Sequence, residues 1–193
     1  MSGFLVHLLR HGAPIRPGLM LGHGDVAAIA PAAPALIARG TGQDISGIVS
    51  SDLRRAAQSG QAIAAAAKRP LTLDARWREL DFGAWDGQAP ADLPADELAR
   101  FWDDPDRCPP PDGERWSALT ARVGRALADL SAATLVVTHA GAMRAALCIL
   151  TGLDHRQGWA IDLPYGALLS LRVWPGGDRP SGQIVGLQTD EVP

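Results

Sequence analysis

Two histidines in this sequence stand at the ends of short apolar runs, and each is followed closely by glycine. His11 comes after FLVHLLR and directly before Gly12, whereas His139 ends the run TLVVTH two residues before Gly141. In open α/β sheets, ligands collect at the carboxyl ends of the strands. We therefore predict that both histidines face one cleft, although they are far apart in the sequence.

Arginines stand at the end of the first of these strands and after another predicted strand. Arg10 directly precedes His11, and the run GIVSS passes into a predicted helix with Arg54 and Arg55 in its first turn. A helix N-terminus favours anions, and a guanidinium adds a fork of hydrogen-bond donors. This set predicts a site for a dianion, most simply a phosphate group. The residues alone do not decide between Arg54 and Arg55.

A neutral imidazole in a phosphate site can attack phosphorus and form a phosphohistidine that water then hydrolyses. Gly12 would let the backbone approach the anion and would leave a carbonyl to orient the other ring nitrogen. The leaving alcohol also needs a proton donor. In WRELDFGAWDG, Glu79 stands before an apolar turn and is the predicted general acid, with Asp81 and Asp86 as alternatives.

The surrounding pattern predicts an α/β fold with three layers, a mostly parallel central sheet between two layers of helices. Short runs of β-branched or bulky apolar residues predict the strands, and helical periodicity fills the segments between them. The tail is predicted to form a hairpin. The predicted strands cover 4–10, 47–51, 134–141 and 168–174, the helices cover 32–39, 52–68, 115–130 and 142–150, and the hairpin covers 175–193.

We predict one domain, residues 1–193, with an insertion at about 81–114 that lies over the active-site end of the sheet. This segment is dense in proline and aspartate and has little regular periodicity. One short helix is predicted near 95–103. Its aromatic residues indicate that part of the insertion packs against the domain.

Composition argues against several classes of function. The net charge is −3, and of the 18 basic residues only Lys68 is a lysine, so no strong attraction to nucleic acid or to an acidic membrane is expected. No long apolar segment, CxxC pair or metal-ligand motif occurs, which predicts a cytoplasmic protein without membrane span, disulfide, metal or cofactor. The tail hairpin and the six tryptophans are compatible with a homodimer.

Four segments together resemble a known family. LLRHGAP, SSDLRRAAQSG, WRELDFGAWDG and VVTHAGAMRA are similar, in order and spacing, to the signature segments of the histidine phosphatase superfamily, which has the phosphoglycerate mutase-like fold. The resemblance implies that His11 is the phosphorylated nucleophile and that Glu79 donates the proton. It also implies that substrate is bound by Arg10, Gly12, His23, Arg55, His139 and Ala140, and it selects Arg55 over Arg54.

The sequence departs from the family pattern after the first motif. Pro14 stands in place of the usual threonine, and Pro17 replaces an asparagine that in relatives helps to line the phosphate pocket. His23 occupies a position where many relatives have glutamine or arginine near the substrate entrance. One polar contact to phosphate is therefore expected to be missing or supplied from elsewhere.

The implied substrate is a small-molecule phosphate ester. The pattern is most similar to the alpha-ribazole phosphatases of cobalamin biosynthesis, whose substrate has an aromatic base that Trp85, Phe101 and Trp102 could stack against. Two alternatives remain, a phosphotransferase of the phosphoglycerate mutase type and a phosphate- or phosphopeptide-binding module without turnover. A metal hydrolase is a third, weaker alternative.

Overall fold

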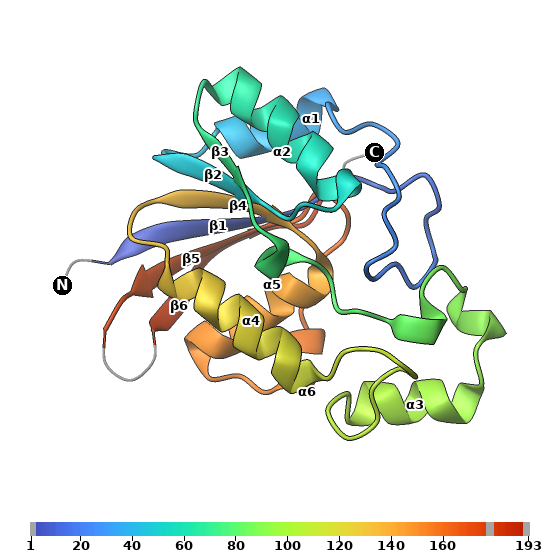
Figure 1. The fold of residues 1–193 in the computed structure, drawn as a ribbon. Coiled ribbons are helices and arrows are strands. Elements are labelled where there is room, and N and C mark those ends of the chain that lie inside the picture. Colours follow the sequence, from blue (N-terminus) through green and yellow to red (C-terminus); the bar gives the residue numbers. More distant parts are fainter. Residues whose placement is uncertain (1–2, 177–179, 191–193) are drawn as a thin grey trace.

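The computed structural model of the chain describes residues 3–176 and 180–190. They form one six-stranded sheet with the strand order β3-β2-β4-β1-β5-β6 and helices on both faces, as predicted (Figure 1). The first four strands in this order are parallel, and β5 and β6 are antiparallel to their neighbours. The strands are β1 (Phe4–Arg10), β2 (Gly47–Ser50), β3 (Leu71–Leu73), β4 (Thr134–Thr138), β5 (Leu168–Trp174) and β6 (Ser181–Gln188).

The register of the two central strands brings the two histidines together. β1 and β4 are buried because their apolar side chains meet helices on both faces of the sheet. Arg10 at the end of β1 pairs with Thr138 at the end of β4. The next residue, His11, donates its backbone N–H to the carbonyl of Thr138 at 3.0 Å. His11 and His139 therefore leave the sheet side by side.

The helices divide between the two faces (Figure 1). α1 (Pro34–Thr41) and α2 (Arg54–Ala67) cover one face, whereas α4 (Trp116–Ala128), α5 (Ala140–Thr151) and α6 (His155–Trp159) lie on the other. Successive side chains of β1 point to opposite faces of the sheet and so contribute to a hydrophobic core on each face. Leu8 belongs to the cluster under α4 and α5, and Leu9 belongs to the cluster under α1 and α2. Among the described residues, no helix is long and apolar enough to cross a membrane.

The predicted element bounds need small corrections. β4 ends at Thr138, not at 141, because His139 is the N-cap residue of α5. Two elements were not predicted, β3 with only three residues and α6 with only five, which are too short for a periodic pattern. β5 and β6 form a hairpin, but its first strand, β5, precedes the predicted range 175–193, which contains only β6. Residues 177–179 and 191–193 of that range lie outside the described residues.

The segment 81–114 lies at the end of the sheet where the parallel strands finish (Figure 1). It contains two short 3₁₀ helices, Gly83–Trp85 and Pro90–Asp92, and the helix α3 (Ala95–Asp103), whose bounds match the prediction. Phe101 in α3 is fully buried and belongs to the same core cluster as β1. The segment is thus packed onto the sheet domain through its aromatic residues.

Candidate active site

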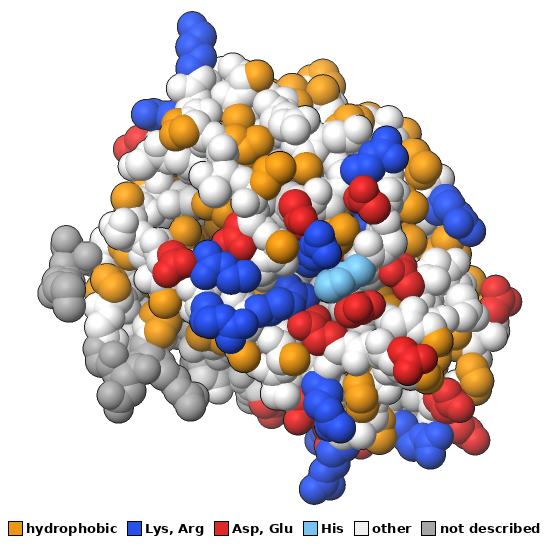
Figure 2. All heavy atoms as spheres, in the orientation of Figure 1, with side chains coloured by type: hydrophobic (Ala, Val, Ile, Leu, Met, Phe, Trp, Pro, Cys, Tyr) orange, Lys and Arg blue, Asp and Glu red, His pale blue; other side chains and the backbone are white. Residues whose placement is uncertain are grey.

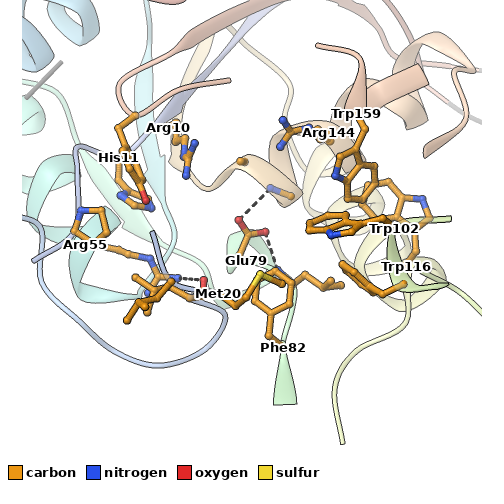
Figure 3. Close-up of a pocket in the computed structure, with 18 residues that line it drawn as sticks. Arg10, His11, Met20, Arg55, Glu79, Phe82, Trp102, Trp116, Arg144 and Trp159 are labelled. Carbon is orange, nitrogen blue, oxygen red and sulfur yellow. Dashed lines mark hydrogen bonds between the residues drawn. The ribbon is translucent and has the colours of Figure 1, made fainter. Parts of the chain in front are cut away.

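A cleft opens at the carboxyl ends of the parallel strands, where the sequence predicted a site (Figure 3). It encloses roughly 710 Å³, part of it open to solvent. One end contains the predicted charged residues, and the other end contains aromatic side chains. On the face drawn in Figure 2, several basic side chains adjoin one another near the centre, and acidic side chains surround them.

His11 is buried at one end of this cleft, with 3% of its surface exposed. Its Nδ1 lies 2.6 Å from the carbonyl oxygen of Gly12, which can only accept a hydrogen bond. Nδ1 therefore carries the proton, and Nε2 has a free lone pair in the neutral ring. Burial lowers the pKa of His11 well below 6.5, and the charges of Arg55 and Arg10 lower it further. At neutral pH this imidazole is uncharged and suited to act as a nucleophile.

His139 lies next to His11, with 4.9 Å between the ring centroids. Its Nε2 is 2.9 Å from the hydroxyl of Ser51, which also accepts the backbone N–H of Leu53 at 3.3 Å. Its Nδ1 is buried and has no hydrogen-bond partner among the described residues. Burial, followed by the charge of Arg55, lowers the pKa of His139 well below 6.5. His139 is fully buried and does not line the cleft, so it contacts the site through its neighbour His11.

Arg10 is fixed in place by contacts on two sides. Its Nη1 donates to the carbonyl of Leu163 at 2.6 Å, and its guanidinium carbon lies 4.0 Å from the ring centroid of Tyr165. Its Nε is buried without a partner among the described residues. Burial lowers the pKa of Arg10, although the guanidinium remains charged at neutral pH.

Arg55 is almost completely buried, with 1% of its surface exposed, and lines the cleft. Its Nη1 donates to Gly24 at 2.8 Å, and its Nη2 donates to Gly22 at 2.6 Å and Leu21 at 3.1 Å. The carboxylate of Asp86 accepts the backbone N–H groups of the same two glycines. The loop that contains Leu21, Gly22 and Gly24 thus fixes the orientation of the Arg55 guanidinium.

Arg54, the alternative to Arg55, is exposed and does not line the cleft. Its backbone N–H donates to the carboxylate of Asp25 at 2.7 Å, and its side chain forms no hydrogen bond with the described residues. The geometry therefore favours Arg55, as the family resemblance implied.

Glu79 lies in the cleft with 9% of its surface exposed. Its Oε1 accepts the backbone N–H of Leu80 at 2.8 Å, and its Oε2 accepts that of Gly141 at 3.1 Å. The alternative acids have other partners, since Asp86 orients the Arg55 loop and Asp81 accepts the N–H of Gly83 at 2.9 Å. The geometry favours Glu79 as the acid.

Of the other predicted ligand-binding residues, some lie at the cleft and others do not. Ala140 lines the cleft, and Gly12 contributes the carbonyl that orients His11. Pro14, which stands in place of the family's threonine, also lines the cleft. His23 instead lies behind Glu79, where its Nε2 donates to the backbone carbonyl of Glu79 at 3.0 Å. Pro17 is exposed and does not line the cleft, so it offers no substitute for the family asparagine.

The aromatic end of the cleft differs from the prediction. Trp85 is buried in the core, where it packs edge-on against Phe101 with 5.6 Å between ring centroids, and it does not line the cleft. The cleft wall is formed by Trp102 of α3, Trp116 of α4 and Trp159 of α6, which we call the tryptophan wall. Sequence reasoning missed the last two because three separate elements bring these rings together.

Two further lining residues, Arg144 and Tyr165, were also missed. Arg144 follows Ala140 by four residues in α5, so both lie on one face of that helix. That spacing could have identified Arg144, since Ala140 was already a predicted ligand-binding residue. Tyr165 is in the loop before β5 and belongs to no motif that would have pointed to it.

An α/β sheet with two neutral histidines, two fixed arginines and one carboxyl at the ends of its parallel strands has the arrangement of a phosphoryl-transfer enzyme. The comparison with known families agrees. The model of the histidine phosphatase superfamily (branch 1) matches residues 6–182, and the chain belongs to this superfamily.

One sequence relative is "Putative phosphoserine phosphatase 2" from Hydrogenobacter thermophilus, 26% identical over 133 residues. The match covers 65% of this chain and 66% of the relative, just under two thirds of its length. The family match and a relative named as a phosphatase support a phosphoric monoester hydrolase.

Solved structures show the same fold. A mycobacterial glucosyl-3-phosphoglycerate phosphatase has a TM-score of 0.81 at 23% identity, covering 95% of this chain and 97% of its own. A "putative alpha-ribazole-5'-P phosphatase" from Escherichia coli has a TM-score of 0.79 at 22% identity, covering 95% of this chain and 96% of its own. At these identities the likeness establishes the fold and leaves the substrate open.

Proposed function

We propose that the protein hydrolyses small-molecule phosphomonoesters through a phosphohistidine at His11. The observation that carries this proposal is the hydrogen bond from His11 Nδ1 to the carbonyl of Gly12, because it leaves Nε2 as a free nucleophile. Arg10 and Arg55 lie beside it as charged donors for the phosphate oxygens. His139, whose ring centroid lies 4.9 Å from that of His11, is the second histidine of the proposed site.

The reaction has two steps. In the first, the lone pair of His11 Nε2 forms a bond to phosphorus as the bond from phosphorus to the alcohol oxygen breaks, and Glu79 donates its proton to that oxygen. In the second, water attacks the phosphohistidine, Glu79 accepts a proton from the water, and the bond from phosphorus to nitrogen breaks. Inorganic phosphate leaves, and both side chains return to their starting protonation states.

Rapid-quench labelling with a radiolabelled phosphomonoester tests this proposal. We expect an acid-labile, base-stable phosphoenzyme whose label maps to His11 and is absent from His11→Ala. His155→Gln is a suitable control, since this histidine donates to the carbonyl of Asp103 away from the cleft. Label that persists in His11→Ala, or no phosphohistidine in a hydrolysing enzyme, would contradict the mechanism.

The same experiment addresses the two alternatives. A mutase would pass the phosphoryl group from His11 to a second hydroxyl, so an added acceptor alcohol would collect label in place of water. A binding module would bind phosphate esters without forming phosphohistidine or releasing phosphate. We expect inorganic phosphate as the main product at every acceptor concentration.

For the alcohol, we propose a flat apolar group that contacts the tryptophan wall, and alpha-ribazole 5'-phosphate is one ester of this kind. Trp102 is 41% exposed, and Trp102, Trp116 and Trp159 all line the cleft beyond Glu79 (Figure 3). Steady-state hydrolysis of a panel of phosphomonoesters tests this. Equal kcat/KM for alpha-ribazole 5'-phosphate and glycerol phosphate would contradict it.

A further inference from the structure

Arg144 lies on the side of Glu79 that faces away from the phosphate end of the cleft. Figure 3 shows Glu79 between Arg10 and His11 on one side and Arg144 and Trp159 on the other. In the proposed mechanism Glu79 protonates the alcohol oxygen. Substituents of that alcohol therefore extend toward Arg144 and the tryptophan wall.

The charge of Arg144 is not neutralised by a direct partner. Its Nη2 donates to the carbonyl of Ile161 at 3.2 Å, and its Nε is buried without a partner in the described part of the chain. No carboxylate in residues 3–176 and 180–190 forms an ion pair with it. A buried donor without a partner is costly, and its presence at a cleft points to a ligand that supplies the acceptor.

The surroundings of Arg144 hold its guanidinium in a defined position. Its Cζ lies 5.8 Å from the ring centroid of Trp159, which in turn packs against Trp116 with 5.0 Å between ring centroids. A fixed guanidinium fork binds a planar carboxylate through two parallel hydrogen bonds. Burial lowers the pKa of Arg144, and the charges of Glu79 and Arg10 act on it in opposite directions. With a single guanidinium next to the tryptophan wall, one negative charge on the alcohol suits the site better than the double charge of a second phosphate.

We propose that Arg144 binds a carboxylate on the leaving alcohol, so that the preferred substrates are phosphate esters of hydroxy acids that also have a flat apolar part. This inference rests on the proposed phosphatase function and narrows its substrate class. Alpha-ribazole 5'-phosphate would contact the tryptophan wall but leave Arg144 without its anion. A carboxylated ester of similar size is the better substrate.

A matched pair of esters tests the inference, 4-carboxybenzyl phosphate and 4-carbamoylbenzyl phosphate, which differ in charge but hardly in shape. For the wild type we expect kcat/KM to be about 10-fold or more higher for the carboxylate, mainly through KM, as for a hydrogen bond between charged groups. Arg144→Gln should remove this preference, so that the two esters are hydrolysed with equal kcat/KM. Arg144→Lys should restore part of the preference, since the charge returns without the fork.

Arg125→Gln on the exposed side of α4 is the matched control and should keep the full preference. Equal kcat/KM for the two esters in the wild type would overturn the inference. An equal loss on both esters in Arg144→Gln would also overturn it, because Arg144 would then act on the phosphoryl group common to both.

A binding measurement separates this inference from the proposed function. Calorimetry with the phosphonates that correspond to the two esters needs no turnover. We expect the carboxylated phosphonate to bind about 10-fold more tightly to the wild type and equally to Arg144→Gln. If this result came from a protein that releases no phosphate, the carboxylate site would stand and the phosphatase proposal would fall. Hydrolysis without any carboxylate preference in binding would instead remove the carboxylate site and leave the phosphatase proposal standing.

Discussion

The Oε2 atom of Glu79 accepts a hydrogen bond from the backbone N–H of Gly141, 3.1 Å away in the first turn of α5. This contact ties the proposed acid to the helix that follows His139. A Cβ atom on residue 141 would overlap Oε1 of Glu79, so only glycine leaves room for the carboxyl at this position. The glycine of the THAGA motif therefore has a steric role in placing the acid.

Gly141→Ala should lower the catalytic rate without lowering the stability of the fold. The added methyl group must displace the Glu79 carboxyl, and we expect kcat on alkyl phosphates to fall by about 10²-fold, the size of loss that a misplaced catalytic group produces. The melting temperature should stay the same or rise, since alanine favours a helix over glycine by up to about 1 kcal/mol. Gly124→Ala in α4 is the control, because its Cβ would lie 3.7 Å from Ile149 and should not affect kcat. Wild-type activity in Gly141→Ala would mean that the position of Glu79 does not matter.

Glu79→Gln should show a dependence on the leaving group. Glutamine keeps the shape of the side chain but has no acidic proton to donate, so alkyl phosphates should lose about 10²-fold or more in kcat. Aryl phosphates, whose leaving groups need less protonation, should lose less. Steady-state kinetics on an alkyl and an aryl ester measure the difference. Asp81→Asn is the control, and a leaving-group dependence that appears in Asp81→Asn and not in Glu79→Gln would identify Asp81 as the donor.

The residues at the phosphate end of the cleft could be predicted from the sequence because they occur in compact local motifs. His11 and His139 stand directly after β1 and β4, and Arg55 lies in the first turn of the helix that follows β2. Parallel strands bring their carboxyl ends to one edge. The layers of the fold were predictable for the same reason, since strand and helix patterns alternate along the chain. Only the antiparallel β5 and β6 depart from the parallel arrangement.

The residues at the aromatic end of the cleft could not be predicted in this way. Trp102, Trp116 and Trp159 belong to three helices, and the packing of α3 and α4 against α6 brings them together. One part of that packing is the ion pair of Arg156 with Asp103 at 2.6 Å, which no local pattern indicates. The choice of Trp85 was wrong because a tryptophan in a proline-rich segment gives no local sign of whether it faces the core or the cleft.

The buried histidines should make the protein sensitive to acid. The pKa values of His11 and His139 lie well below 6.5 in the folded protein, whereas both return to about 6.5 on unfolding. Below pH 6.5 the unfolded chain therefore binds more protons, and the free energy of unfolding falls as the pH decreases toward the folded-state pKa values. Each histidine contributes a slope of about 1.4 kcal/mol per pH unit in this window and nothing above it.

Urea unfolding of the wild type and His139→Gln, measured from about pH 7.5 to about pH 5, tests this expectation. The variant should lose stability with a slope shallower by about 1.4 kcal/mol per pH unit below pH 6, and the two slopes should agree above pH 7. His7, whose pKa is also lowered by burial, is present in both proteins and cancels from the difference. Equal slopes at every pH would mean that the pKa of His139 is the same in the folded and the unfolded protein.

Arg122 and Glu114 form a clamp behind the segment that carries Glu79. Arg122 donates to the carbonyls of Arg76, Arg78 and Glu79 at 2.7 to 2.8 Å, and it pairs with both oxygens of Glu114 at 2.8 Å. The two side chains are only 13% and 15% exposed. Removing the arginine therefore leaves the Glu114 carboxylate with the N–H of Asp81 at 3.3 Å and without its cation. The carbonyls of Arg76 and Arg78 lose the donor that Arg122 supplied, whereas the carbonyl of Glu79 keeps the contact with His23.

Arg122→Met should lower the free energy of unfolding by about 3 kcal/mol or more, the usual cost of breaking a buried pair from one side. The double variant Arg122→Met, Glu114→Leu should be more stable than the single variant, since no charge then remains buried without a partner. Urea unfolding of both single variants and the double variant gives the coupling energy. At a temperature where Arg122→Met stays folded, its kcat should fall more on alkyl than on aryl phosphates, because the clamp acts through Glu79. If the single and double variants were equally stable and kcat were unchanged, the clamp would have no part in placing the acid.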